Sequence, residues 1–401
     1  MAVKKKATKP SENDFSFFQT MKTGNAIADS GIRVETEEFI DTGCYTLNAI
    51  YSGDIFKGFP SNRMMQLAGE QAVGKTFFTI FGHCRPLVEQ GYYIFYIDTE
   101  SAVDAPMLES YGLSEGSYTI LPCITVEDVR KTVAGILDQV EAANKKTKTR
   151  KKVAFMMDSL GNLTTEKAIQ DTSDGKDTRD MTKQQGLKRM FSELVNRMGT
   201  MNIPWVITNH VYEKIGAYVP TKVVSGGSGA LYNSSVILVL RKRDLKDKNK
   251  IQTGNIIIAK ANKSRYVKNN AEVQFNLDFN TGLNKYYGLH LLAQQYGLLV
   301  DWVKSDHGPD SDTPISRPTG LHHSSKAYVL INPDKPYTEW VCVSDAGLHK
   351  KSGIGTILEP LNEFIKKDFQ FTSPILAMTE EEENERLEAL AQLEFDDDAS
   401  E

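Results

Sequence analysis

Eight consecutive residues carry the clearest chemistry in this sequence. The segment GEQAVGKT, residues 69–76, matches the phosphate-binding loop pattern and directly follows an apolar run. Its glycines let the backbone curl so that amides point at phosphate oxygens, while Lys75 reaches the β and γ phosphates and Thr76 ligates Mg²⁺. The plainer alternative is a glycine-rich turn with an incidental lysine. The expected nucleotide site consists of Gly69, Glu70, Gln71, Ala72, Val73, Gly74, Lys75, Thr76 and Phe77.

Acidic residues follow two further apolar runs. VAFMMDS places Asp158 after five apolar residues, and YYIFYIDTE places Asp98 and Glu100 at the end of another run. Because the carboxyl ends of parallel strands meet at one edge of a sheet, we expect these acids beside the phosphates. Asp158 is then the second Mg²⁺ anchor with Thr76, and Glu100 the base that orients or deprotonates the attacking water. The alternative is that Asp98 and Glu100 only cap the next segment.

Short apolar runs alternate with amphipathic segments between about residues 40 and 300 and predict the elements that position these side chains. The expected strands are 64–68, 92–97, 153–157, 205–208, 235–240, 255–260 and 273–279. The expected helices are 76–89 (kinked or shortened at Pro86), 126–143, 182–201 and 289–296, with apolar residues at three- and four-residue spacing. This alternation predicts an α/β fold with a mainly parallel central sheet, and the late strands predict an antiparallel extension.

Composition predicts four regions. Residues 1–38 form an N-terminal arm, partly disordered, that serves oligomerisation; the alternative is that its aromatic residues dock on their own core. Residues 39–300 form the nucleotide-binding core. Residues 301–378 form a small mixed C-terminal domain with a helix at 355–367, and residues 379–401 an acidic disordered tail. The apolar runs are too short to cross a bilayer and the lysine-rich start has no apolar signal core, so no membrane partner is expected and the protein is expected to be cytoplasmic. The four cysteines lack zinc or disulfide spacing.

Charge is divided unevenly along the chain. The net charge is −5, but residues 380–401 hold eleven acidic residues and one arginine, so the rest of the chain carries +5. A mildly basic body with an acidic tail suits a DNA-binding protein whose tail competes with phosphate for the basic surface. The alternative is a solvated tail that only aids solubility.

Five motifs in order resemble those of one family. GEQAVGKT, YIDTESAVD, FMMDSLGNL, WVITNH and GGSGALYNSS together resemble the motif set of RecA-type strand-exchange recombinases, over about residues 40–300. The NH ending and the DSLGN segment resemble the phage branch of UvsX-like proteins. The resemblance implies a RecA-type P-loop ATPase core with a mainly parallel sheet, an N-terminal arm and a small C-terminal domain. It also implies ATP and Mg²⁺ as cofactors and a helical filament on single-stranded DNA.

The resemblance also assigns roles to single residues. Glu100 becomes the catalytic carboxylate and Asp104 a contact to the adenine. His210 stands where the family has a polar γ-phosphate sensor, usually Gln in the bacterial branch, and the alternative is a structural hydrogen-bonding role. Lys263 and Arg265 fit the basic residues that reach the γ-phosphate of a neighbouring subunit; the alternative is a solvated strand edge. The candidate catalytic residues are Glu100, Lys75, His210, Lys263 and Arg265.

Two polar segments are the candidate DNA loops. Residues 161–182, containing DTSDGKDTRD, are expected to be disordered without DNA, and residues 211–229 to form a mobile glycine-rich loop that by resemblance is the second DNA loop. The γ-phosphate would fix His210, and His210 would fix this second loop in its DNA-binding form. The candidate DNA contacts are Lys176, Arg179, Lys214, Tyr218, Lys222, Gly226 and Gly227.

These residues and the resemblance predict an ATP-dependent recombinase, a DNA-dependent ATPase that forms filaments on single-stranded DNA and catalyses homologous pairing and strand exchange in recombination and repair. Its expected partners are single-stranded and double-stranded DNA and further copies of the chain, with single-strand-binding and mediator proteins as further candidates. One alternative is a RecA-fold ring helicase; the lack of a sizeable helical domain before the core argues against it. The other is a non-catalytic recombination mediator; the presence of Lys75, Glu100 and Asp158 argues against it.

Overall fold

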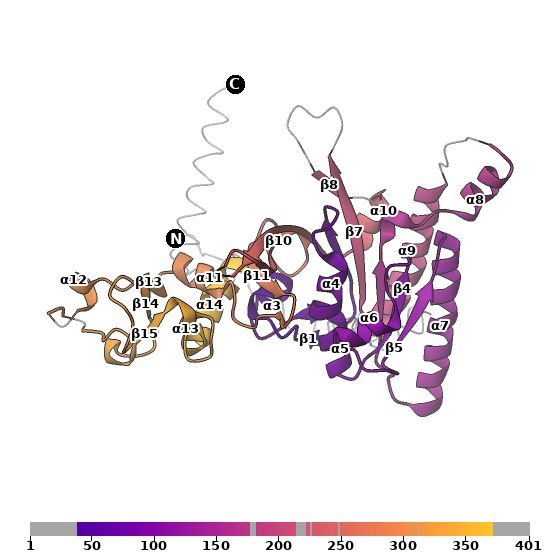
Figure 1. Ribbon diagram of the computed structural model, residues 1–401. Coiled ribbons are helices and arrows are strands. Elements are labelled where there is room, and N and C mark those ends of the chain that lie inside the picture. Colours follow the sequence, from indigo (N-terminus) through magenta and orange to yellow (C-terminus); the bar gives the residue numbers. More distant parts are fainter. Residues whose placement is uncertain are drawn as a thin grey trace, which may run out of the picture. The chain divides into compact units, whose positions relative to one another are not determined.

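The computed structural model describes residues 38–176, 182–213, 222–224, 227–247, 249–308, 310–312 and 314–371. The chain divides into two compact units, Met1–Thr36 and Glu37–Glu401, and every described residue belongs to the second. Helices pack on both faces of a large twisted sheet in this unit (Figure 1).

The large sheet has ten strands in the order β12-β11-β10-β9-β3-β7-β6-β4-β5, with β8 paired to one end of β7. From β9 to β5 all neighbours are parallel, and from β9 to β12 they are antiparallel. The predicted α/β fold with an antiparallel extension is therefore confirmed (Figure 1). Its strands are β3 Met64–Gly69, β4 Tyr93–Asp98, β5 Tyr118–Pro122, β6 Val153–Asp158, β7 Trp205–Glu213, β8 Lys222–Val224, β9 Val236–Lys246, β10 Gln252–Ser264, β11 Glu272–Asp278 and β12 Gly282–Leu283.

The pairing register brings the chemically interesting residues to one edge of this sheet. Gly69, which ends β3, is level with His210 of β7, and Asp98 of β4 is level with Asp158 of β6. Gly69, Asp98 and Asp158 are the last residues of their strands, and His210 is level with Gly69, so all four lie at the edge of the parallel sheet where ligands bind in sheets of this kind. The sequence predicts that β7 ends at residue 208. That boundary is wrong, because the polar residues after it continue as a strand to Glu213 and pair with β8.

Alternating side chains of the parallel strands fill two cores, one on each face of the sheet. Phe155 and Met157 of β6 face one core, whereas Ala154 and Met156 face the other. This alternation is what a strand buried on both faces requires. The first core is covered by α7 Val126–Thr147 and α9 Lys183–Thr200, and the second by α3 Tyr45–Ser52, α4 Lys75–Thr79 and α5 Arg85–Glu89.

The helix that follows the nucleotide loop is interrupted. The sequence predicts one helix over residues 76–89, kinked or shortened at Pro86. The structure instead divides it into α4, a π-helical turn η2 over Ile80–Cys84, and α5. The N–H of Arg85 bonds to the carbonyl of Ile80, five residues back, directly before the proline. A proline has no N–H to donate and its ring crowds the preceding turn, so a wider turn here avoids the conflict.

The C-terminal residues form a three-stranded antiparallel sheet with short helices. Ile365 and Phe369 of the last helix belong to the same apolar cluster as the α3 face of the large sheet, so the two regions share buried surface. The helix predicted over 355–367 is observed as a 3₁₀ turn followed by α14. The elements are α11 Leu289–Gln295, β13 Leu299–Asp301, α12 Lys304–His307, β14 Ala327–Leu330, η4 Tyr337–Glu339, β15 Val341–Ser344, α13 Asp345–Leu348, η5 Ile354–Ile357 and α14 Leu358–Phe369.

The expectation that residues 161–182 are disordered is wrong for much of the segment. Leu160–Asn162 forms a 3₁₀ turn, η3, and Glu166–Ser173 forms the helix α8. The hydroxyl of Thr165 accepts the N–H of Ala168 and caps this helix, a local signal that outweighs its polar composition. The remaining elements are β1 Phe39–Ile40, β2 Phe59–Pro60, α6 Ala105–Ser110 and α10 Gly227–Asn233.

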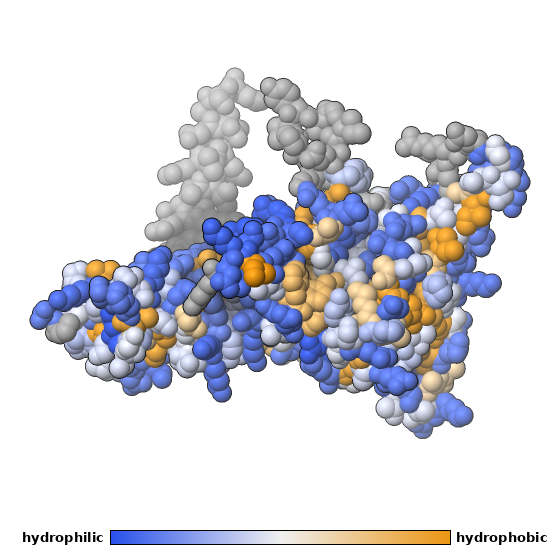
Figure 2. Space-filling view, in the orientation of Figure 1, coloured by the Kyte–Doolittle hydropathy of each residue, from blue (hydrophilic) through white to orange (hydrophobic). Residues whose placement is uncertain are grey.

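Hydrophilic residues dominate the visible surface, and hydrophobic residues gather in smaller patches over the parallel half of the large sheet (Figure 2). Among the described residues, no helix has both the length and the apolar character needed to cross a bilayer.

Candidate functional site

The nucleotide loop curls around its own lysine. Ala72 and Gly74 both have positive φ angles, 58° and 92°, which turn the backbone back on itself between β3 and α4. The Lys75 Nζ donates to the carbonyl oxygens of Gly69 and Glu70, at 3.1 Å and 2.9 Å. Burial lowers the pKa of Lys75, and the nearby carboxylates of Asp158 and Glu100 partly oppose that shift. The loop therefore holds a buried cation ready for an anionic ligand, as a phosphate-binding loop requires.

Hydroxyl groups orient the carboxylate of Asp158. Thr76 Oγ1 donates to Oδ2 of Asp158 at 2.5 Å, and the Tyr96 hydroxyl donates to the same oxygen at 3.1 Å. Thr208 donates to the other oxygen, Oδ1. Burial, and next the charge of Asp158, raise the pKa of Tyr96 far above its usual value, so this phenol stays protonated as a donor. Thr76 and Asp158 bring two hard oxygen ligands together beside the nucleotide loop, and this pair fits Mg²⁺, which takes few protein oxygens and completes its shell with water and phosphate.

Three side chains from neighbouring strands meet next to this pair. Ser159 Oγ donates to Glu100 Oε1 at 2.6 Å and lies 3.4 Å from His210 Nε2. His210 Nε2 lies 3.5 Å from the same Glu100 oxygen. Glu100 follows β4, Ser159 follows β6 and His210 belongs to β7, so the parallel sheet order sets this geometry. The carboxylate of Glu100 and the imidazole of His210 thus lie side by side at this edge of the sheet.

Nine of the predicted site residues line one pocket of about 270 Å³, whereas Gly69, Glu70, Val73, Asp104, Lys263 and Arg265 are not among its lining residues. Lys75, Thr76, Glu100, Asp158 and His210 reach it from the carboxyl ends of four strands, β3, β4, β6 and β7. The pocket thus brings together a loop of the phosphate-binding pattern, an oxygen pair that fits Mg²⁺, a carboxylate and an imidazole, a set of groups that suits hydrolysis of a nucleoside triphosphate. Its lining is completed by Gln71, Ala72, Gly74, Phe77 and Met107.

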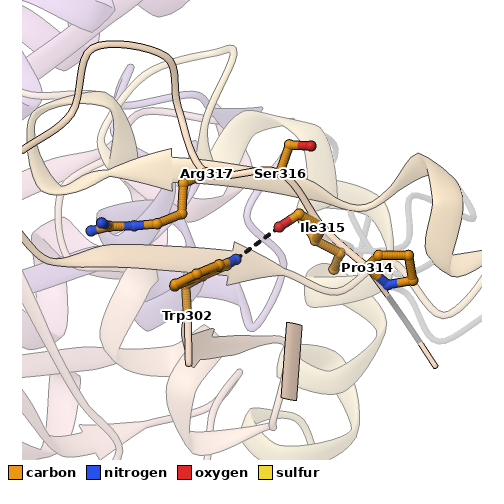
Figure 3. A pocket seen from close by; sticks show the side chains of 5 residues that line it. All are labelled: Trp302, Pro314, Ile315, Ser316 and Arg317. Atoms are coloured by element: carbon orange, nitrogen blue, oxygen red, sulfur yellow. Dashed lines mark hydrogen bonds between the residues drawn. The ribbon is translucent and has the colours of Figure 1, made fainter. Parts of the chain in front are cut away.

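A cavity of about 510 Å³ in the C-terminal region lacks this equipment. Trp302 donates its indole N–H to the carbonyl of Ile315, and the Arg317 guanidinium lies 5.1 Å above the indole ring (Figure 3). With Pro314 and Ser316, these residues form the part of the lining that the structure describes, and none of them carries a carboxylate. The chemistry therefore belongs at the edge of the large sheet.

Asp104 has a structural task that the sequence did not indicate. Its carboxylate accepts the N–H of Met107 at 2.8 Å and caps α6. A contact to the adenine stays a prediction for this residue. Phe77 packs against Phe81 and Tyr111, with ring centroids 4.5 Å and 5.0 Å apart, so its side chain belongs to an aromatic cluster.

The two candidate trans-acting residues differ in their surroundings. Lys263 Nζ donates to the carbonyls of Leu231 and Tyr232, at 2.6 Å and 3.1 Å, where α10 ends. Burial, and next the charge of Arg265, lower the pKa of Lys263. The Arg265 side chain is exposed and, among the described residues, has no hydrogen bond or ion pair. Arg265 is therefore the more available of the two for another subunit.

The candidate DNA contacts are only partly described. Lys176 Nζ forms an exposed ion pair with Asp174 at 3.0 Å. Gly227 begins α10 with a φ of 68°, in the left-handed region that favours glycine, and an added Cβ would push aside the end of the exposed Gln184 side chain. Lys222 belongs to β8. Four candidates lie outside the described residues: Arg179, Lys214, Tyr218 and Gly226.

Sequence reasoning missed the residues that hold the chemical groups in place. Ser159 joins Glu100 to His210, while Tyr96 and Thr208 orient Asp158. A weak signal existed for Ser159, because it directly follows the metal anchor in FMMDS. Tyr96 and Thr208 lie inside apolar strands, where sequence pattern alone assigns them to the core.

Comparison with known proteins identifies a family model and several relatives. The model of the RecA N-terminal domain matches residues 5–284. The recombination and repair protein of Enterobacteria phage T4 is 28% identical over 266 residues, 66% of this chain and 65% of that protein, so the match spans less than two thirds of the phage protein. Protein RecA of Synechococcus sp. strain CC9902 is 24% identical over 294 residues, 72% of this chain and 71% of that protein.

A crystal structure of the RadB recombinase aligns with a TM-score of 0.44 and 17% identity, over 61% of this chain and 98% of that chain. A score at this level supports no inference. The fold follows from the strand order and from the family match.

Proposed function

This chain belongs to the RecA family, and from that premise we propose that it is an ATP-dependent recombinase of the phage type. It would form helical filaments on single-stranded DNA and catalyse homologous pairing and strand exchange with double-stranded DNA. In this proposal residues 39–300 are the ATPase core, residues 301–378 a small C-terminal domain, residues 1–38 an oligomerisation arm and residues 379–401 an acidic tail. The site of action is the cytoplasm, that of a host cell if a phage encodes the protein.

One observation carries the proposal: a cation, a metal anchor, a base and a hydrogen-bond donor from four strand ends line a single pocket. Lys75 would exchange its two loop carbonyls for phosphate oxygens. Glu100, whose carboxylate accepts one short hydrogen bond within the described part of the chain, from Ser159, would accept a proton from the attacking water. Mg²⁺, held by Thr76 and Asp158, would neutralise charge that develops on the phosphates.

His210 is proposed as the sensor of the γ-phosphate. To the residues that the structure describes, its Nε2 makes two long contacts, at 3.4 Å and 3.5 Å, so an anionic oxygen could replace both with one strong hydrogen bond. The strand that carries His210 continues into the hairpin of β7 and β8, which lies within residues 211–229, the proposed second DNA loop. Binding of ATP would thereby bias the loop toward its DNA-binding form.

Electron microscopy and an ATPase assay test the function together. Purified protein with single-stranded DNA and a slowly hydrolysed ATP analogue should give helical filaments, and DNA should stimulate ATP hydrolysis. Strand exchange between a single strand and a homologous duplex should require ATP. Closed rings would favour a RecA-fold helicase. DNA binding without ATP hydrolysis would favour a recombination mediator. Absence of any nucleotide-dependent assembly on DNA would refute the proposal.

A further inference from the structure

A buried amide on the central strand connects the proposed sensor strand to α10. Gln66 lies in β3, three residues before the nucleotide loop, and its side chain is fully buried. Asn209 Nδ2 donates to Gln66 Oε1 at 3.1 Å, and Asn209 Oδ1 accepts the backbone N–H of His210 at 2.8 Å. Gln66 Nε2 in turn donates to the carbonyl of Ala230 at 2.8 Å and to Ser234 Oγ at 2.7 Å. An unbroken chain of hydrogen bonds therefore runs from His210 to α10.

The residue type suits this connection. A glutamine offers an acceptor and two donors on one planar group, and here all three functions are used at once. Gln66, Asn209 and Ser234 are each at most 1% exposed, so none of them can exchange its partner for water. A buried polar group that loses its partner is costly, and movement of Asn209 would therefore be passed on to Gln66 and to α10.

Helix α10 is also the element to which Lys263 is bound. The Lys263 amine holds the carbonyls of Leu231 and Tyr232, so α10 contacts the Gln66 chain on one side and the candidate trans-acting lysine on the other. The segment that leads into α10 is the proposed second DNA loop. Any change in the position of α10 would reach both that loop and Lys263.

We propose that Gln66 is a positioning residue that transmits the nucleotide-bound state of His210 to α10, and through α10 to the second DNA loop. Gln66 itself lines neither the nucleotide pocket nor the exposed surface. The inference rests on the proposed function, since it takes ATP as the ligand sensed and DNA as the ligand affected.

The variant Gln66→Met tests the link, because methionine has a similar length and flexibility but no hydrogen-bonding amide. In the wild type, an ATP analogue should raise DNA affinity by about 5- to 150-fold, the usual range of allosteric coupling, and Gln66→Met should lower this factor to about one, so that the analogue no longer raises DNA affinity. Affinity for the nucleotide itself should change less than about threefold, because no loop or metal contact is removed. Ser234→Ala, which removes one acceptor of the chain, should give a smaller loss of the same kind.

Asn362→Leu provides the matched control. Asn362 of α14 is also a buried amide with partners on both sides, the N–H of Ile55 at 2.9 Å and the carboxylate of Asp54 at 3.0 Å. Its removal should destabilise the fold to a similar degree, yet the coupling between nucleotide and DNA should remain that of the wild type. An equal loss of coupling in both variants would mean that general destabilisation of the fold causes the loss, and it would overturn the proposal.

Hydrogen exchange measured without DNA separates this proposal from the function on which it rests. Addition of the ATP analogue should protect the amides of residues 227–233 in the wild type and in Asn362→Leu, but not in Gln66→Met. Equal protection in Gln66→Met would overturn the link even if the protein is a recombinase. If the wild type binds no DNA, the proposed function fails, while the exchange result still decides whether Gln66 connects nucleotide to α10.

Discussion

Gly161→Ala should displace His210 without touching the nucleotide loop. Gly161 lies in the 3₁₀ turn η3, and an added Cβ would come within 2.8 Å of Cδ2 of the His210 ring. The backbone of Gly161 is outside the left-handed region, so alanine itself is compatible with the local conformation. The substitution therefore acts through a single carbon–carbon contact with the proposed sensor.

The size of the effect follows from that distance. Since the Cβ would start 2.8 Å from the ring carbon, the imidazole must move by roughly 0.6 Å to restore an ordinary contact. A misplacement of about 1 Å at a catalytic group can cost on the order of 100-fold in rate, so a shift of this size should cost about tenfold in DNA-stimulated ATP hydrolysis. Nucleotide affinity should change less than about threefold, because Lys75 and Thr76 keep their contacts.

The assay is steady-state ATPase activity with saturating single-stranded DNA, accompanied by direct measurement of ATP affinity. Gly135→Ala in the middle of α7 is the control, since a Cβ there meets no atom within 4 Å and alanine favours helix. That variant should keep the wild-type rate. Undiminished DNA-stimulated hydrolysis in Gly161→Ala, or a loss of ATP binding in step with the rate, would refute the role assigned to His210.

Three further predictions follow from the site and the core. Glu100→Gln should abolish ATP hydrolysis while filaments still assemble with ATP, as electron microscopy and phosphate release would show. Mixing Arg265→Ala subunits with Glu100→Ala subunits should restore part of the ATP turnover. The mixture of Lys263→Ala with Glu100→Ala should restore less, because the Lys263 amine is bound to α10. Absence of rescue in both mixtures would contradict action in trans. Burial lowers the pKa of His83 to about 3. Below pH 6.5 the His83 imidazole therefore takes up a proton when the protein unfolds. Urea denaturation should show the free energy of unfolding falling by up to about 1.4 kcal/mol per pH unit as the pH is lowered from 6.5 toward 3, and His83→Gln should reduce this slope.

The location of the site could be predicted because its chemistry is tied to sequence-local signals. Lys75 and Thr76 directly follow a glycine loop, and Asp158 directly follows a buried strand. Parallel pairing then brings such strand ends together whatever the details of packing, so Glu100 and His210 fall in the same pocket.

The supporting contacts could not be predicted, because they depend on the register between strands distant in sequence. Gln66 and Asn209 are 143 positions apart, and only the alignment of β3 with β7 makes them partners. Likewise, Asp104 caps a short helix that no periodic pattern indicates. The polar composition of residues 161–182 predicts disorder, because average composition does not register a single helix-capping residue. Thr165 is such a residue, and it caps α8.

The geometry around Glu100 explains how one histidine can respond to a phosphate at small energetic cost. Ser159 satisfies Glu100 Oε1 with a short bond of 2.6 Å, so the carboxylate does not depend on His210. The imidazole contacts both residues only at 3.4 Å and 3.5 Å, distances at which a hydrogen bond is weak. A γ-phosphate that took up the imidazole in place of these two weak contacts would leave the Glu100–Ser159 pair in place for the attacking water. The proposed base and the proposed sensor thus lie side by side at the sheet edge, and a phosphate could draw the imidazole away without breaking the bond between Glu100 and Ser159.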